Sequence, residues 1–134
     1  MEPAGDNVGM DGRACPCGLG DDYDVCCGRL HAGAPAPTAE ALMRARYSAF
    51  AVGDLGYLLG SWHRSSRPAA FSLDRSIEWT RLAVLETADG GLFDDAGTVQ
   101  FRAVYRRDCA RGVLDETSRF VREDGRWTYL GPVD

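Results

Sequence analysis

Four cysteines crowded into thirteen residues are the strongest constraint that this sequence places on its fold. Cys15 and Cys17 form one pair and Cys26 and Cys27 the other, in a C-x-C-x8-C-C pattern. Zinc binds four thiolates in a tetrahedron at roughly 2.3 Å, so a short loop has to bring the two pairs together from opposite sides. Glycines beside each pair permit the tight backbone that this needs. We therefore predict a structural zinc site with four cysteine ligands.

The expected cellular compartment agrees with metal binding. The first residues, MEPAGDNVGM, have neither the basic n-region nor the apolar h-region of a signal peptide. No run of about eighteen apolar residues follows that would cross a bilayer. We therefore expect a cytoplasmic protein without membrane attachment, where closely spaced cysteines bind metal more often than they form disulfides. Buried thiols, redox-active thiols and an iron site are the competing interpretations.

Residues 1–34 form the predicted zinc-binding segment with its linker. Apart from Leu19, Tyr23, Val25 and Leu30, these residues offer little apolar surface to bury. So little burial does not offset the chain entropy of ordering the segment, and metal binding supplies the missing stabilisation. Arg13 and Arg29 flank the cluster and are expected to offset part of its negative charge. His31 follows a complete set of four ligands, so we expect it to support the site rather than to bind the metal.

The length and composition of the chain limit the functions that it can have. With 134 residues it is long enough for one core of ordinary size and hardly for two, so residues 35–134 are expected to form a single domain. A net charge of −5 disfavours nucleic acid as a partner. All fifteen basic residues are arginine, which excludes a catalytic lysine, a Schiff base and a P-loop lysine. Glycine-rich nucleotide motifs and the G-x-S-x-G motif of serine hydrolases are also absent from the sequence.

The pattern of residues 35–134 predicts helices first and strands after. Thr38 suits the N-cap of a helix, and Gly53 its C-terminal end. Apolar residues form two neighbouring stripes along this helix: Leu42, Ala45, Ala49 and Val52 in one, and Met43, Tyr47 and Phe50 in the other. Asp54 suits the N-cap of a second short helix over LGYLLGSW, which runs into a loop. The stretch HAGAPAP before Thr38 is expected to be an unpacked linker.

From Ile77 onward the residues alternate as strands do. WTRLAVLET, TVQFRAVYR and VLDETSRFVRE each show this pattern, and EDGR before WTYL contains the Asp-Gly signal of a tight hairpin. RDCARG is expected to be a loop between the second and third strands. Together, these consecutive strands are expected to form an antiparallel meander. We therefore predict the α+β class, with helices packed on one face of a curved antiparallel sheet.

Two stretches of the sequence resemble known patterns. CPCGLGDDYDVCCG is similar to the SEC-C zinc motif, and HAGAPAPTAEALMRARYSAF resembles the YchJ-type family of small bacterial proteins. The likeness extends through nearly the whole chain and implies a cystatin-like domain resembling nuclear transport factor 2. It implies zinc as the cofactor and no particular activity. Where the family pattern suggests a histidine in Leu-His-Glu-x-Ser-Arg-Phe, this chain has Asp115, so no imidazole acts there.

A curved sheet around helices makes a cone whose concave face is the default place for a small-molecule pocket. The polar and aromatic candidates for its lining are Arg46, Tyr47, Trp62, His63, Tyr105, Glu116 and Ser118. His63 and Glu116, if hydrogen-bonded, would form a general acid–base pair. The alternative is that the three tryptophans are core residues, that His63 is a loop residue, and that Glu116 pairs with an arginine.

Three functions are therefore open. The first is a non-enzymatic binding or adaptor module that meets a protein partner through the zinc motif, as SEC-C motifs elsewhere imply. The second is a small-molecule enzyme or binder that uses the cone. In the third, zinc only stabilises a domain whose partner surface lies elsewhere. We favour the first, because the cysteine pattern is the most specific signal in the sequence. Cys109, far from the cluster, is expected to be an ordinary loop or core thiol.

Overall fold

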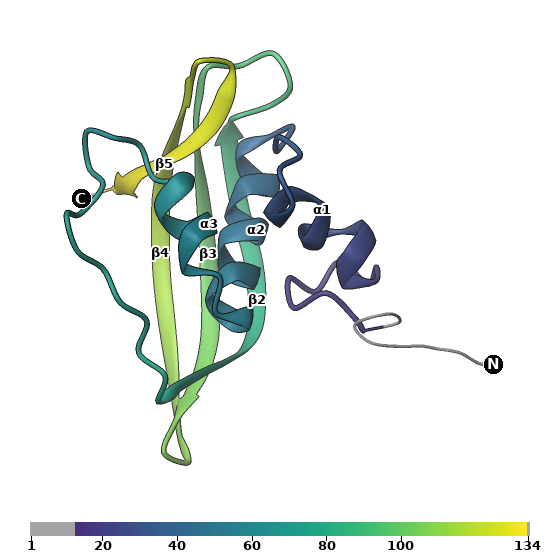
Figure 1. Cartoon of the computed structure of the whole chain (residues 1–134), viewed down its shortest axis with the longest axis vertical. Coiled ribbons are helices and arrows are strands. Elements are labelled where there is room, and N and C mark those ends of the chain that lie inside the picture. Colours follow the sequence, from purple (N-terminus) through teal and green to yellow (C-terminus); the bar gives the residue numbers. More distant parts are fainter. Residues whose placement is uncertain (1–12, 134) are drawn as a thin grey trace.

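A four-stranded antiparallel sheet and one long helix organise the chain, whose computed structural model describes residues 13–133 (Figure 1). The strands form a meander: β2 (Ile77–Asp89), β3 (Ala96–Arg107), β4 (Ala110–Glu123) and β5 (Arg126–Pro132). The helical elements precede them: the 3-10 turn η1 (Tyr23–Val25), α1 (Cys27–His31), α2 (Ala39–Val52) and α3 (Leu55–Gly60). The predicted α+β class, with helices packed on a curved antiparallel sheet, is confirmed.

Side-chain caps set the limits of α2 and α3, as the sequence predicts. The Thr38 hydroxyl accepts a hydrogen bond of 3.1 Å from the backbone N–H of Ala41, at the start of α2. Gly53 ends the helix in the left-handed conformation, with φ of 82°. The carboxylate of Asp54 then accepts from the N–H of Tyr57 at 3.0 Å and begins α3. The two helices therefore follow each other with almost no connecting loop.

The core lies between α2 and the concave face of the sheet. Register shifts in the β2–β3 and β4–β5 ladders mark bulges, which bend the strands. The inward-facing residues of both layers are buried: Leu42, Met43, Ala45, Tyr47 and Ala49 from α2, and Val99, Phe101, Ala103, Phe120 and Trp127 from the sheet. Val52, expected on the apolar stripe, is instead 39% exposed, because it lies in the last turn of the helix.

Two tight turns join the last three strands. Asp124 and Gly125 both have positive φ and form the hairpin between β4 and β5, as the Asp-Gly signal predicts. The expected loop RDCARG is shorter than predicted, because Arg107 already pairs with Ala110. Only Asp108 and Cys109 remain between these strands, and both adopt positive φ.

The segment before α2 is packed, contrary to the prediction of an unpacked linker. His31 is the last residue of α1 and not part of a loop, and Ala36 is buried. The indole N–H of Trp127 donates to the carbonyl of Pro37 at 3.3 Å. Small residues pack here because their backbone, rather than large side chains, supplies the contact with β5.

The β2–β3 connection lies against the start of α2. The N–H of Ala39 donates to the carbonyl of Gly90 at 2.9 Å, so this turn satisfies one of the free N–H groups of the helix. Gly97 faces Gly90 so closely that a Cβ on Gly97 would lie 2.5 Å from the Cα of Gly90. Two glycines are therefore required where the hairpin closes.

We predict that Gly97→Ala lowers the free energy of unfolding by about 1–3 kcal/mol, because backbone atoms have to move apart. Gly91→Ala is the matched control, since a Cβ there meets only the side chain of Asp94, at 3.4 Å. Urea unfolding of both variants measures the difference. Equal loss in the two variants would contradict the close packing at Gly97.

Candidate functional site

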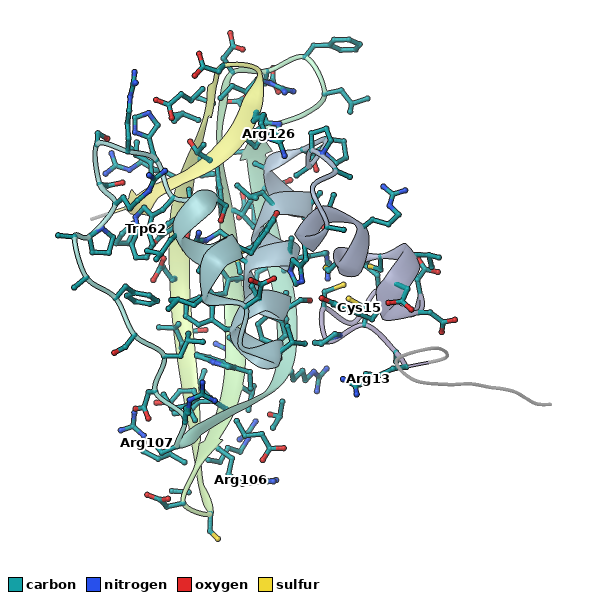
Figure 2. The ribbon with its side chains drawn as sticks, viewed as in Figure 1. Arg13, Cys15, Trp62, Arg106, Arg107 and Arg126 are labelled. Carbon is teal, nitrogen blue, oxygen red and sulfur yellow. The ribbon has the colours of Figure 1, made fainter. Side chains whose placement is uncertain are left out.

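The four cysteines of the N-terminal segment converge on one point. The Sγ atoms of Cys15, Cys17, Cys26 and Cys27 all lie within 4.8 Å of one another. The sulfur atoms beside Cys15 are visible at the edge of the helical layer (Figure 2). Four sulfurs at roughly 2.3 Å from a central zinc would be about 3.8 Å apart, close to the 3.6 Å between Cys17 and Cys26. The donor set and its spacing therefore fit a tetrahedral metal ion.

Backbone hydrogen bonds close the loop that carries the first cysteine pair. The N–H of Cys15 donates to the carbonyl of Asp21 at 2.9 Å, and the N–H of Tyr23 donates to that of Arg13 at 2.8 Å. The second pair begins α1. Gly28 follows it directly, and a Cβ there would lie 2.6 Å from the carbonyl oxygen of Tyr23. Two short elements thus present the two pairs to each other.

Helix α2 holds the cysteine segment against the rest of the protein. The hydroxyl of Ser48, fully buried, lies 3.5 Å from the Sγ of Cys15, and Arg44 donates to the carbonyl of Cys17 at 2.9 Å. His31 bonds the hydroxyl of Tyr23 at 2.6 Å through Nδ1 and the carbonyl of Ala45 at 2.8 Å through Nε2. His31 lies outside the group of sulfur atoms and joins α1 to α2.

The sequence analysis missed the roles of Arg44 and Ser48. It placed Arg13 and Arg29 beside the cluster, but these two side chains are exposed, whereas Arg44 makes the contact. The signal was present, because Arg44 and Ser48 are four residues apart and therefore lie on one face of a largely apolar helix.

Proximity changes the acidity of the thiols. Hydrogen bonding from Cys27 and its neighbours lowers the pKa of Cys17 to about 5. Burial, with the adjacent Cys17, raises the pKa of Cys26 to about 12, and the hydrogen bond to Cys17 together with burial raises the pKa of Cys27. One thiolate is thus favoured and further thiolates beside it are disfavoured. A divalent cation would remove this repulsion, so the cluster is able to bind a metal ion.

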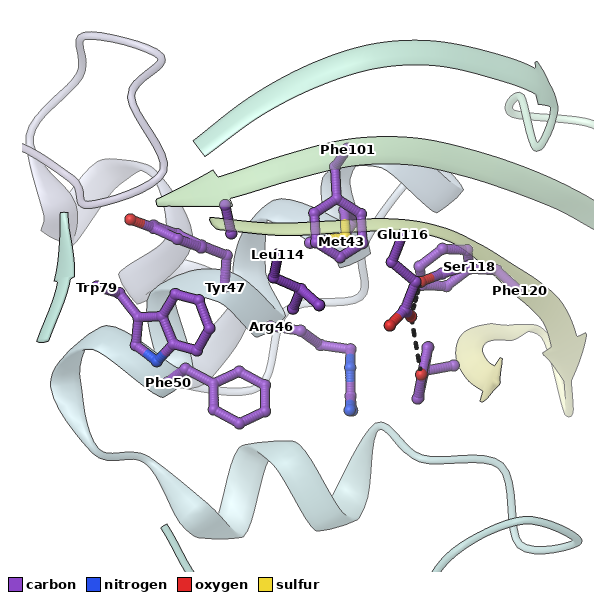
Figure 3. Close-up of a pocket in the computed structure, with 12 residues that line it drawn as sticks. Met43, Arg46, Tyr47, Phe50, Trp79, Phe101, Leu114, Glu116, Ser118 and Phe120 are labelled. Atoms are coloured by element: carbon purple, nitrogen blue, oxygen red, sulfur yellow. Dashed lines mark hydrogen bonds between the residues drawn. The ribbon is translucent and has the colours of Figure 1, made fainter. Parts of the chain in front are cut away.

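A second candidate site lies inside the cone, between α2 and the sheet. It is a cavity of about 140 Å³ with a mostly apolar wall (Figure 3). Its lining residues are Met43, Arg46, Tyr47, Phe50, Trp79, Phe101, Ala103, Leu114, Glu116, Ser118, Phe120 and Tyr129. Four of the seven residues proposed from the sequence, Arg46, Tyr47, Glu116 and Ser118, thus come together here.

Arg46 is the buried cation of this cavity, with 5% of its surface exposed. Its Nη1 donates to the carbonyl of Leu58 at 2.8 Å and to the hydroxyl of Ser61 at 2.7 Å. The guanidinium carbon lies 4.3 Å from the ring centroid of Tyr129, a cation–π distance. Burial lowers the pKa of Arg46 to about 10, so it stays charged at neutral pH. No ion pair joins it to a carboxylate anywhere in residues 13–133.

Glu116 supplies the opposite charge. Its Oε2 accepts hydrogen bonds from the hydroxyls of Ser118 at 2.6 Å and Tyr129 at 3.2 Å. Burial, together with the nearby Glu116, raises the pKa of Tyr129 to about 12, which keeps its phenol protonated as the donor. The hydroxyl of Tyr47 points away from Glu116 (Figure 3). Arg46 and Glu116 thus face one cavity without neutralising each other directly.

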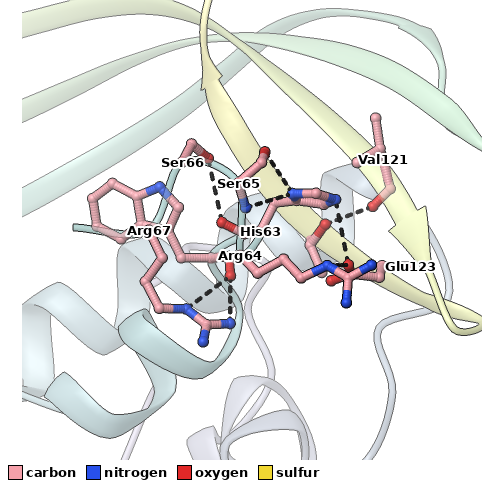
Figure 4. A network of polar contacts seen from close by, with 9 residues as sticks. His63, Arg64, Ser65, Ser66, Arg67, Val121 and Glu123 are labelled. Carbon is pink, nitrogen blue, oxygen red and sulfur yellow. Dashed lines mark hydrogen bonds and ion pairs between the residues drawn. The ribbon is translucent and has the colours of Figure 1, made fainter. Parts of the chain in front are cut away.

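The other three candidates lie outside the lining. Trp62 is behind Arg46, with its ring centroid 5.1 Å from the guanidinium carbon. Tyr105 packs edge-on against Trp79, with ring centroids 5.3 Å apart. His63 contacts Glu123 at 3.6 Å and Ser65 at 2.8 Å (Figure 4). The acid–base pair of His63 and Glu116 is therefore not formed, because His63 follows α3 along the edge of β5 rather than entering the cone.

Asp115 and Cys109 belong to neither site. Asp115 accepts a hydrogen bond of 2.7 Å from Nε of Arg102 on the exposed face of the sheet. Successive residues of a strand point to opposite faces, which separates Asp115 from Glu116. Cys109 is exposed in its two-residue turn, as expected for a loop thiol. Within the described chain, no helix is long and apolar enough to cross a membrane.

A cysteine cluster on a cone-shaped helix-and-sheet domain defines a class of small α+β proteins with an N-terminal metal motif. The family model described as "YchJ, middle NTF2-like domain" matches residues 38–132. The chain therefore belongs to the YchJ family, as its resemblance implied. The UPF0225 protein of Streptomyces coelicolor is 56% identical over 86% of this chain and 90% of its own length. That of Corynebacterium glutamicum is 50% identical over 92% and 99%.

Solved structures show the same arrangement. A SEC-C motif containing protein from Rhodopseudomonas palustris superimposes with a TM-score of 0.77 at 32% identity, over 90% of this chain and 98% of that one. Another SEC-C motif containing protein, from Psychrobacter arcticus, has a TM-score of 0.76 over 92% of this chain and 84% of that one. At 24% identity it shows the fold alone.

We predict that Arg46→Lys lowers the free energy of unfolding by about 2 kcal/mol, because an ammonium does not bond Leu58 and Ser61 while stacking on Tyr129. Chemical denaturation measures the loss. Arg102→Lys on the exposed sheet face is the matched control and is expected to leave the midpoint unchanged. Equal midpoints for the two variants would show that the Arg46 contacts contribute nothing to folding.

Proposed function

We propose that the protein is a zinc-dependent binding module without catalytic activity, in which one Zn²⁺ joins the N-terminal segment to α2. The observation that carries the proposal is the convergence of four Sγ atoms within 4.8 Å. Four thiolates fill a tetrahedral zinc ion, which leaves no open position for a substrate. Zinc is favoured over an iron–sulfur cluster because the four Sγ atoms, all within 4.8 Å of one another and two of them from the adjacent Cys26 and Cys27, are spaced for a single ion. The reducing cytoplasm, where we place the protein, keeps such thiols available.

The proposed metal ion would stabilise the fold of the N-terminal segment. Cys15, Cys17 and Cys27 are buried, yet the segment around them offers little apolar surface to order it. Besides its few apolar contacts, its connection to α2 includes polar contacts, from Ser48 to Cys15 and from Arg44 to the carbonyl of Cys17. A bound Zn²⁺ would hold the two cysteine pairs together and so keep these contacts in register.

The proposed partner surface is the outer side of the same segment. Between the two cysteine pairs, Leu19 and Val25 expose 57% and 64% of their surfaces. They border a shallow hollow that reaches Pro37 and Ala41 on the neighbouring elements. Exposed apolar side chains on a rigid metal-bound loop are suited to contact with another protein. Because the overall charge is negative, we do not assign a nucleic acid to this surface.

The first test is metal content. We expect about one zinc per chain in protein purified without added metal, and a melting temperature that falls by roughly 10 °C on chelation. Cys26→Ser should reproduce the loss of metal and of thermal stability. Cys109→Ser, which removes an exposed thiol outside the cluster, is the matched control and should retain both. Wild-type protein without metal, or equal zinc in both variants, would refute the proposed site.

The second test addresses the partner surface. Leu19→Ser combined with Val25→Ser should leave zinc content and melting temperature unchanged, since both side chains are exposed, but abolish retention of a specific cellular protein. Phe93→Ser removes a side chain that is 96% exposed on the β2–β3 connection and is the matched control. Quantitative pull-downs compare these variants with Cys26→Ser. A partner retained equally by all of them would place the interface elsewhere.

A further inference from the structure

The cavity of the cone is a second site, independent of the cysteine cluster. Its two charged residues are held in place by neighbours but keep free hydrogen-bonding groups. Arg46 uses only Nη1 in hydrogen bonds to described residues, so Nε and Nη2 have no partner among residues 13–133. Glu116 uses Oε2 for both Ser118 and Tyr129, and its Oε1 likewise has no described partner. Arg46 is buried, and buried polar groups are normally satisfied, so its free N–H groups are suited to a ligand, while Oε1 of the half-buried Glu116 offers an acceptor in the same cavity.

The size and wall of the cavity limit the body of that ligand. An engineered apolar cavity of roughly 150 Å³ holds one benzene molecule, and this cavity measures about 140 Å³. Its walls include aromatic rings from α2 and from all four strands, among them Phe50, Trp79 and Phe101. A single apolar ring therefore fits the cavity.

The charges limit the polar group of the ligand. The two charged side chains of the lining, Arg46 and Glu116, have opposite sign, so the net charge of the wall is zero. A carboxylate would pair with Arg46 but be repelled by Glu116. A protonated amine would pair with Glu116 but be repelled by Arg46. A neutral group with one acceptor and one donor on neighbouring atoms satisfies both residues without bringing an unpaired charge into an apolar cavity.

We propose that the cavity binds a small molecule composed of one apolar ring and a primary carboxamide. The amide carbonyl accepts from the free N–H groups of Arg46, and the amide nitrogen donates to Oε1 of Glu116. Ser118 and Tyr129 act as positioning residues, because they fix the Glu116 carboxylate through its other oxygen. The ring lies among the aromatic side chains of the wall. The site needs no metal and no covalent step.

The test uses the full chain as purified and four probes: benzamide, benzoate, benzylamine and toluene. Proton–nitrogen correlation spectra follow the Nε–H of Arg46 and the indole N–H of Trp79 during titration. Benzamide should bind at least about tenfold more tightly than each of the others, since each lacks one or both charge-assisted hydrogen bonds. Tighter binding of benzoate would show an anion site instead, and equal binding of toluene would show an apolar cavity only. Either result overturns the proposal.

Three variants separate the cavity from the rest of the surface. Leu114→Trp, at a lining position that is 38% exposed, should fill the cavity and abolish benzamide binding. Glu116→Gln should weaken benzamide about tenfold and strengthen benzoate, because the negative charge is lost and the hydrogen bond from the amide nitrogen is no longer charge-assisted. Asp115→Asn makes the same charge change on the opposite face and is the matched control. Benzamide binding that survives Leu114→Trp, or that falls equally in the two carboxylate variants, overturns the proposal.

Discussion

The packing of α2 on two sides is the constraint on which the rest of this structure depends. One face of the helix, through Arg44 and Ser48, holds the cysteine segment. The neighbouring face, through Met43, Arg46 and Tyr47, forms a wall of the cavity. Because a helix is rigid over its 14 residues, α2 fixes the positions of the side chains that it contributes to both sites. A change in the position of α2 on the sheet would therefore alter both sites.

The polar and charged groups of the two sites are stabilised in different ways. In the cysteine cluster, the thiols lie so close together that one thiolate disfavours the next, and the cluster is able to bind a metal ion. In the cavity, a buried arginine and a half-buried glutamate are each held by hydroxyl, carbonyl and ring partners rather than by each other. The first arrangement suits structural stabilisation. The second leaves hydrogen-bonding groups available, which suits reversible binding of a small molecule.

Sequence reasoning was most accurate where the cause is local. The caps at Thr38 and Asp54 and the Asp-Gly hairpin were predicted because each depends on residues a few positions apart. It was less accurate where backbone packing replaces side-chain burial, as in the segment before Pro37. Sequence reasoning left open whether His63 and Glu116 form a pair, since their distance depends on how α3 meets the edge of β5; the structure places His63 beside Glu123 instead.

By itself, the sequence determined the cysteine pattern, the order of helices and strands, and the alternation that places Glu116 and Ser118 on one face of β4. These follow from spacing and from the period of each element. Only the tertiary structure decided that Ser48 would reach Cys15, that Arg46 would meet no carboxylate of residues 13–133 in an ion pair, and that Tyr129 would hold Glu116. These contacts join residues that are distant in the sequence, so their geometry depends on the curvature of the sheet and the seating of α2.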